Sequence, residues 1–184
     1  MAFGATYDAC VLYPACLRDF LVRLGGRRLF QARWTEQILD EMTNAVLRNR
    51  DDITAKQLER TRTLMCNAVP DCLTTGYEGL IEGLELPDPN DRHVLAAAIR
   101  AGSGVIVTEN MKDFPISALQ PYNIEPQTPD TFVRHLLDIA EADVRAVIWQ
   151  QAADLKNPPM TEDDVLARLA TQGLPLSVAI LRDS

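Results

Sequence analysis

The chain has 184 residues, of which 47% are hydrophobic and 24% are charged, and its net charge is −8. These proportions are typical of a folded globular protein and exclude a disordered chain. There is no apolar run of about 18 residues, the length that a membrane span needs, and no basic segment leads into an apolar leader. We therefore expect a cytoplasmic protein that makes no contact with membranes.

The first half of the chain alternates strand and helix patterns. Residues 3–9 form a short apolar run typical of a strand, and a helix is expected from Pro14 to about Leu24, before the Gly25-Gly26 pair. Apolar residues at helical spacing predict further helices at 35–48 and 54–68, and residues 71–75 are a candidate strand.

The middle of the chain repeats this alternation. A helix is expected at 91–101, a buried strand at 104–108, a brief strand at 122–127 and a helix from about Pro129. Strands that alternate with helices predict a parallel sheet covered on both faces, with a ligand crevice beyond the carboxyl ends of its strands. The expected fold is α/β, with three α/β/α layers and a central parallel sheet.

From about residue 142 the pattern is helical only. Asn157-Pro158-Pro159 interrupts it, and Thr161 followed by Asp164 indicates a capping box at a new helix. A second break at Gly173-Leu174-Pro175 precedes a last short helix. We therefore divide the chain into a domain at 1–141 and a C-terminal helical extension at 142–184.

Charge is unevenly distributed along the chain. Residues 1–70 carry ten Lys or Arg and eight Asp or Glu, whereas residues 71–184 carry eight and eighteen. The basic residues of the first part suit a phosphate backbone, but ordinary solvated arginines explain each of them equally well. Whether Arg27, Arg28 and Arg48 contact a substrate stays open.

Asp8 ends the first predicted strand, where an unpaired buried carboxylate would cost several kcal/mol unless it bound a cation or a set of donors. A strand-end Asp can instead cap the next helix. Because that helix is expected only from Pro14, we favour a cation ligand at Asp8.

Two more acids occupy predicted helices. On the 35–48 helix, Glu41 lies at the flank of the apolar face while Asp40 points away. Asp88 is placed to cap the 91–101 helix, and Asp91 shares the face of that helix that looks toward the sheet. A solvated Glu41 and a helix-dipole role for Asp91 remain alternatives.

The loop after the 104–108 strand carries further oxygen ligands. Thr108 and Asn110 offer neutral oxygens or orienting donors, and Asp113 supplies charge. Taken together with Asp8, Glu41 and Asp91, these residues suit Mg²⁺, which prefers carboxylate and carbonyl oxygens. Such a site can activate water against a phosphodiester. The joint arrangement therefore predicts a metal-dependent hydrolase.

Four segments together resemble the PIN domain, most closely the VapC-like toxin ribonucleases of bacterial type II toxin–antitoxin pairs. They are YDACVLYP at 7–14, the helix from Trp34 to Glu41, LPDPNDRHVLAAA at 86–98 and VTENMKDFP at 107–115. The resemblance covers about residues 3–140. It implies an endoribonuclease that uses Mg²⁺ or Mn²⁺, frequent homodimers, and an antitoxin protein that occludes the acidic site.

Carried over by motif, the family's acids match Asp8, Glu41 and Asp91, with Asp8, Asp91 and Asp113 as the metal ligands. The fourth position departs from the pattern, because some members have an aspartate where this chain has Asn110. Either Asn110 or Asp113 fills that position. Whether the site holds one metal ion or two remains open. The extension beyond residue 140 lies outside the common core, and we expect it to contact a partner or a second copy of the chain.

Other protein classes compete with this interpretation. A signalling receiver would use Asp8, Thr108 and Lys112, but it needs a second acid beside Asp8, where this chain has Ala9. A catalytically silent module that binds RNA or antitoxin remains an alternative, because the fourth acidic position is incomplete.

Overall fold

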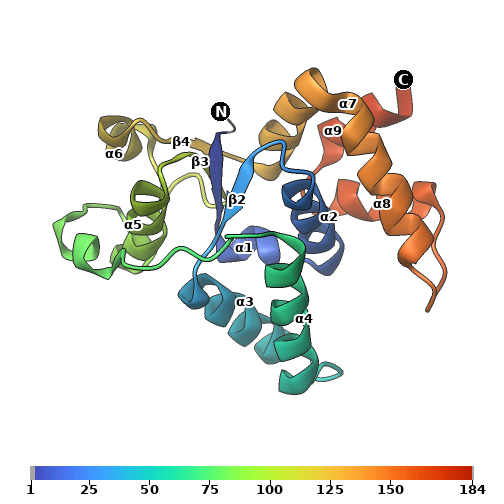
Figure 1. The fold of residues 1–184 in the computed structure, drawn as a ribbon, viewed down its shortest axis with the longest axis horizontal. Coiled ribbons are helices and arrows are strands. Elements are labelled where there is room, and N and C mark those ends of the chain that lie inside the picture. Colours follow the sequence, from blue (N-terminus) through green and yellow to red (C-terminus); the bar gives the residue numbers. More distant parts are fainter. Residues whose placement is uncertain (1–2, 184) are drawn as a thin grey trace.

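The computed structural model describes residues 3–183 and contains one parallel sheet (Figure 1). Its strands are β1 (Gly4–Tyr7), β2 (Gln31–Arg33), β3 (Ser103–Val107) and β4 (Glu125–Gln127). They lie in the order β2-β1-β3-β4 and all neighbours are parallel. The chain leaves β1 toward β2 and later returns to β3 on the other side. The crevice between β1 and β3 is therefore the topological switch point, where α/β folds bind ligands.

Helices surround this sheet. Those of the first two thirds of the chain are α1 (Ala9–Leu12), α2 (Ala15–Gly26), α3 (Glu36–Asn49), α4 (Ala55–Ala68), η1 (Glu78–Gly83), η2 (Pro89–Asp91), α5 (Arg92–Ala101), α6 (Ile116–Leu119) and η3 (Gln120–Tyr122). Figure 1 shows α5 on one side of the sheet, α2 on the other, and α3 and α4 beyond the end of β1 that leads into α1. The predicted three-layer α/β/α fold is confirmed.

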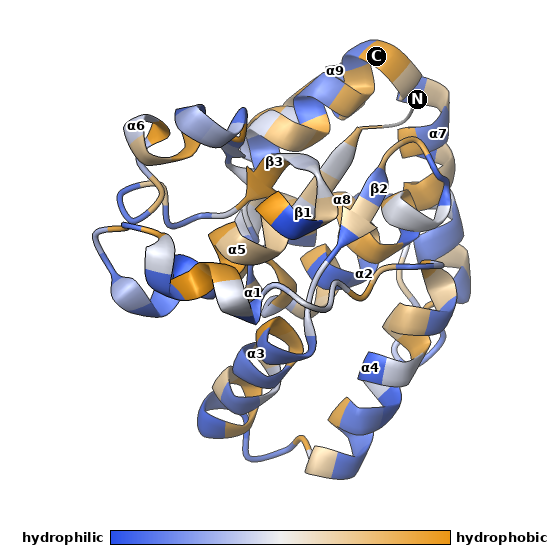
Figure 2. Cartoon of the chain, turned by 60° about the vertical axis from the view of Figure 1, so that its left-hand side comes forward, coloured by the Kyte–Doolittle hydropathy of each residue, from blue (hydrophilic) through white to orange (hydrophobic). Residues whose placement is uncertain are grey.

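The core is built on the apolar strands. Hydrophobic residues cover β3 and much of α5, whereas hydrophilic residues occupy large parts of α3 and α4 (Figure 2). Tyr7 is fully buried, stacks on Trp34 with ring centroids 6.1 Å apart, and donates its hydroxyl to the carbonyl of Leu21. Gly25 lets α2 approach β2, because a Cβ at this position would stand 2.8 Å from that of Ala32. These contacts fix β1, and with it the position of Asp8.

Some elements differ from those expected. The three-residue β2 and the four-residue α1 and α6 were not anticipated, and the expected strand at 71–75 is reduced to a single bridge between Trp34 and Leu73. The thiols of Cys16 and Cys72 are buried, whereas those of Cys10 and Cys66 are only partly buried.

Three helices complete the chain: α7 (Pro129–Asp154), α8 (Glu162–Thr171) and α9 (Pro175–Asp183). Helix α7 has a non-helical residue at Ala140, so the proposed boundary at 141/142 falls just past this kink and remains a prediction. The predicted capping box of Thr161 and Asp164 is confirmed. Within residues 3–183, none of the helices combines the length and hydrophobicity that a bilayer crossing requires.

The last helices are fastened to the rest of the chain by buried polar groups. The carboxylate of Asp130, in the first turn of α7, accepts hydrogen bonds from Leu176 N (3.0 Å), Ser177 N (2.8 Å) and Ser177 Oγ (2.6 Å) at the start of α9. The side-chain oxygen of Gln172 accepts from Leu17 N at 3.0 Å. Helices α8 and α9 therefore have fixed attachments to both α7 and α2.

Candidate active site

The site begins where β1 and β3 end side by side. Tyr7 pairs with Val107 in the sheet, so Asp8 and Thr108 leave neighbouring strands at the same edge. The Oγ1 of Thr108 donates a hydrogen bond to Oδ2 of Asp8 at 2.7 Å. Because Thr108 is fully buried and Asp8 is only 7% exposed, this bond fixes the Asp8 carboxylate at the switch point.

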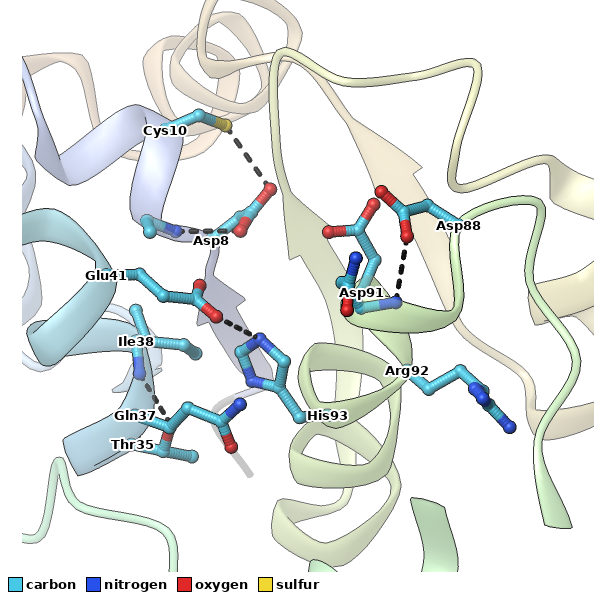
Figure 3. A network of polar contacts seen from close by, with 12 residues as sticks. Asp8, Cys10, Thr35, Gln37, Ile38, Glu41, Asp88, Asp91, Arg92 and His93 are labelled. Carbon is cyan, nitrogen blue, oxygen red and sulfur yellow. Dashed lines mark hydrogen bonds and ion pairs between the residues drawn. The ribbon is translucent and has the colours of Figure 1, made fainter. Parts of the chain in front are cut away.

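Asp8 also caps a helix, which our sequence reasoning disfavoured. Its Oδ1 accepts from Ala9 N at 2.7 Å, at the start of the short helix α1. We expected the next helix only at Pro14 and so judged capping improbable. That inference was wrong, because a single helical turn intervenes. The thiol of Cys10 on the same turn donates to Oδ2 at 3.3 Å (Figure 3).

Asp91 faces Asp8 across the crevice, at the junction of η2 and α5 (Figure 3). The side chain of Asp88 accepts from Asn90 N at 2.9 Å and so caps η2, as expected, whereas Asp91 caps nothing. Burial and, in decreasing order, the charges of Asp8, Asp88, Asp113 and Glu41 together raise the pKa of Asp91 from 3.8 to about 6. Three of these carboxylates, those of Asp8, Asp113 and Glu41, come from other segments of the chain and were expected beside Asp91 from the sequence.

Glu41 reaches the cluster from α3. Its side chain is 42% exposed, and its Oε1 lies 2.7 Å from Nε2 of His93, whose side chain is 3% exposed (Figure 3). The contact has ion-pair distance but not hydrogen-bond geometry, and neither ring nitrogen of His93 has a hydrogen-bond partner among the described residues. Asp40 points elsewhere and pairs with Arg62 on α4 at 2.6 Å. Glu41 is therefore a close polar neighbour of the buried His93.

The loop after β3 contributes the remaining predicted residues. Asn110 donates from its backbone to Oγ1 of Thr108 at 3.0 Å, and its side-chain nitrogen lies 3.5 Å from Oδ2 of Asp91. Asp113 is partly buried and acts on Asp91 through its charge. The structure thus brings Asp8, Glu41, Asp91, Asp113, Asn110 and Thr108 to one edge of the sheet.

Metal binding was tested against this arrangement. Among residues 3–183, no three His, Cys, Asp or Glu side chains form a ready-made set of metal ligands. The donors are nonetheless hard oxygens, and no Lys or Arg in the described chain forms an ion pair with Asp8, Asp91 or Asp113. Mg²⁺ keeps several waters and takes few protein carboxylates directly. The residues present therefore fit a hydrated divalent cation.

Three contributors were missed in the sequence reasoning. Asp88 was interpreted only as a cap, yet its charge raises the pKa of Asp91. His93 and Cys10 contact Glu41 and Asp8, but only the packing of α3 and α5 and the turn of α1 bring these pairs together. The signal available in the sequence was weak: His93 lies two residues after Asp91, on the buried face of the same helix.

Two family models and one curated relative match this chain. The family model of the PIN domain matches residues 5–112, and that of the VapC50 C-terminal domain matches residues 129–183. The chain is 41% identical over 109 residues to the protein named "Putative ribonuclease VapC50" of Mycobacterium tuberculosis. That alignment covers 57% of this chain and 64% of the relative, which is less than two thirds of its length. No solved structure matches the chain.

Proposed function

The chain belongs to the PIN domain family, and on this basis we propose that it is a metal-dependent endoribonuclease that hydrolyses RNA phosphodiesters in the cytoplasm. The observation that carries the proposal is the convergence of carboxylates on Asp91, whose pKa rises to about 6. Like charges gathered at a switch point destabilise one another unless a cation offsets them. Such a cluster suits a function in which a cation is bound at the site.

The proposed ligands of Mg²⁺ or Mn²⁺ are Asp8, Asp91 and Asp113, with Asn110 and Thr108 in support. A bound divalent ion supplies positive charge beside the phosphodiester and makes a bound water more acidic. Thr108 keeps one Asp8 oxygen oriented through its 2.7 Å hydrogen bond, and Ala9 N holds the other at 2.7 Å. The chain thus aims both oxygens of Asp8 before any ligand arrives.

Glu41 is the proposed proton acceptor. Its carboxylate lies at the rim of the cluster, is 42% exposed, and stands against the nearly buried His93. A general base must reach the attacking water while keeping a fixed direction. The contact with His93 restricts Glu41 on one side and leaves its other side open to water.

The proposed partners follow from the family. The relative is named a ribonuclease, and matches to both a PIN domain and a VapC50 C-terminal domain support the role of a toxin in a toxin–antitoxin pair. We expect a cognate antitoxin that covers the acidic crevice, and a homodimer in solution. A short protein encoded directly beside this gene, with a DNA-binding N-terminal part, would support the antitoxin assignment.

The test is cleavage of labelled RNA by the purified protein with Mg²⁺, with Mn²⁺ and with EDTA. We expect internal cleavage with either metal, none with EDTA, and none by Asp8→Asn, whose fold is checked by circular dichroism. Asp138→Asn is a matched control, because the exposed side chain of this aspartate on α7 has no hydrogen bond or ion pair with any described residue. Cleavage by Asp8→Asn at the rate of the unmodified protein would overturn the proposal.

The second candidate is a catalytically silent module that binds RNA or antitoxin. It is favoured by the lack, within residues 3–183, of a ready-made set of three metal ligands. Calorimetric titration with Mg²⁺ or Mn²⁺, together with the RNA cleavage assay, distinguishes the silent module from the nuclease. The silent module binds neither ion and leaves RNA intact.

A further inference from the structure

One arginine beside the acidic cluster lacks a partner. Six of the nine arginines between residues 18 and 62 bind acids or carbonyl and amide oxygens: Arg18, Arg23, Arg27, Arg33, Arg50 and Arg62. Within the described chain, Arg28, Arg48 and Arg60 have no such contact. Arg48 differs from the other two because it lines a hollow that also contains a proposed catalytic residue.

This hollow lies between α1 and α3 and measures about 440 Å³. Cys10 and Glu41 form its inner wall, and both belong to the acidic site: the Cys10 thiol donates to Asp8, and Glu41 is the proposed proton acceptor. Tyr13 and Arg48 also line the hollow. Tyr13 is partly buried and Arg48 is exposed, so an aromatic side chain and a guanidinium both line the hollow.

We propose that this hollow binds the nucleotide adjacent to the cleaved bond of a single-stranded RNA. Arg48 pairs with that nucleotide's phosphate, and its base stacks on Tyr13. The inference rests on the proposed function, because it places the nucleotide beside Glu41. Its volume lies within the range of about 300–1,000 Å³ typical of small-molecule sites.

Electrostatics support a phosphate at Arg48. The acidic cluster repels an RNA backbone, so a strand that crosses it needs cationic contacts on either side in addition to any metal. The other nearby arginine, Arg50, is already bound by Asp52 at 2.7 Å. Among the described residues, Arg48 is therefore an unpaired arginine at this hollow, whereas Arg50 is not. Base stacking on an aromatic ring tolerates any sequence, which suits a contact next to the cut.

The test uses the full chain with Asp8→Asn as background, so that bound RNA stays intact. Binding of a fluorescent single-stranded oligoribonucleotide is measured by anisotropy between 50 and 200 mM KCl. One phosphate contact to a single strand contributes about 0.7 to the salt slope. Arg48→Gln should therefore weaken binding about fivefold near 0.1 M salt and reduce the slope by about 0.7.

Tyr13 is tested in the same assay. Tyr13→Ala should weaken binding about fivefold or more without changing the slope, whereas Tyr13→Phe keeps the ring and should bind within about twofold. The control is Arg100→Gln: Arg100 is also exposed and in the last turn of a helix, but it precedes β3 and so lies at the opposite edge of the sheet, where its Nε donates to the carbonyl of Thr75 at 3.4 Å. If Tyr13→Ala does not fold, the slope for Arg48→Gln decides.

The outcomes separate the two proposals. An unchanged affinity and slope in Arg48→Gln, in a protein that cuts RNA, overturns the nucleotide site and leaves the nuclease assignment standing. Loss of antitoxin binding in Arg48→Gln with unchanged RNA binding would identify a protein contact instead and would likewise overturn it. If the unmodified chain neither binds nor cuts RNA, both proposals fail.

Discussion

Replacing Asp91 with asparagine should stabilise the metal-free protein at neutral pH while abolishing RNA cleavage. Burial and four neighbouring carboxylates raise the pKa of this group from 3.8 to about 6, so its charged form is disfavoured in the folded state. Asparagine has the same shape and no charge. The side-chain carbonyl of the new asparagine can still accept a hydrogen bond from the side-chain nitrogen of Asn110, which lies 3.5 Å from Asp91. The substitution therefore removes little favourable interaction.

The size of the effect follows from the shift. One pKa unit corresponds to about 1.4 kcal/mol, so two units give at most roughly 3 kcal/mol. Asp91 is only partly buried, and solvent screening should leave about 1 kcal/mol of this. A position at a helix N-terminus favours a negative charge by about 0.3–1 kcal/mol. Because the pKa of Asp91 is raised and not lowered, burial and repulsion outweigh that attraction.

The pH dependence gives the prediction its sign. The pKa of Asp91 is higher in the folded protein than in the unfolded chain, so its contribution to stability is fully present below about pH 3.8. That contribution is lost as the pH rises through about 6. Asparagine does not titrate. The two proteins should therefore be equally stable near pH 3.5 and should diverge progressively up to about pH 7.

The assay is thermal unfolding in EDTA across this pH range, followed by circular dichroism. For a chain of this size, about 1 kcal/mol raises the Tm by roughly 2–4 °C. Asp138→Asn removes the same charge from an exposed site and should change stability by less than about 0.5 kcal/mol. Added Mg²⁺ should raise the Tm of the unmodified protein but not that of Asp91→Asn. A lower Tm for Asp91→Asn at pH 7.5 in EDTA would refute the account of Asp91 as a mutually repelled carboxylate.

Three further substitutions test the contacts around the site and the fold that carries it. His93→Ala removes the contact that restricts Glu41 and should lower the cleavage rate about 10–100-fold. His93→Gln keeps a donor near the Nε2 position and should restore part of that rate. Equal cleavage rates for the unmodified protein and both variants would contradict this prediction. Asp130→Asn turns an amide NH₂ toward one of the backbone donors at the start of α9. It should lower the free energy of unfolding, measured in urea, by about 2–4 kcal/mol. A decrease below about 0.5 kcal/mol would show that the attachment of α9 does not depend on this charge. Gly25→Ala places a methyl group 2.8 Å from a side chain of β2 and should destabilise the protein by about 1–3 kcal/mol in the same measurement, unless α2 can shift without loss.

Local patterns were sufficient for the long elements. The helices at 36–49 and 55–68 carry capping threonines, Thr35 and Thr54, followed by apolar residues at helical spacing, so their signals lie within one segment. The strand β2 has only three residues, and it exists because Gln31 to Arg33 pair with β1. No short-range pattern marks such a strand, since its stability comes from the neighbouring strand.

The site shows the same division. The positions of Asp8 and Thr108 could be predicted because parallel strands end at one edge of the sheet, and the structure pairs them at 2.7 Å. The approach of Glu41 to His93 depends on how α3 packs against α5, which the spacing within either helix does not determine. The capping of α1 by Asp8 was missed because a four-residue helix is too short to show a periodic pattern.

The loop after β3 joins the acidic cluster to the C-terminal helices, and its acids divide between the two. Asp113 contributes to the raised pKa of Asp91, whereas the pKa of Glu109 is raised by burial and by Asp130 of α7. Glu109 lies against Gly173, at the turn between α8 and α9, where a Cβ would stand 2.5 Å from its Oε1. The turn therefore approaches the loop closely. The left-handed backbone of Gly173 (φ 119°) is a second reason for glycine at this position. The C-terminal helices thus contact the loop that also carries Asn110 and Asp113.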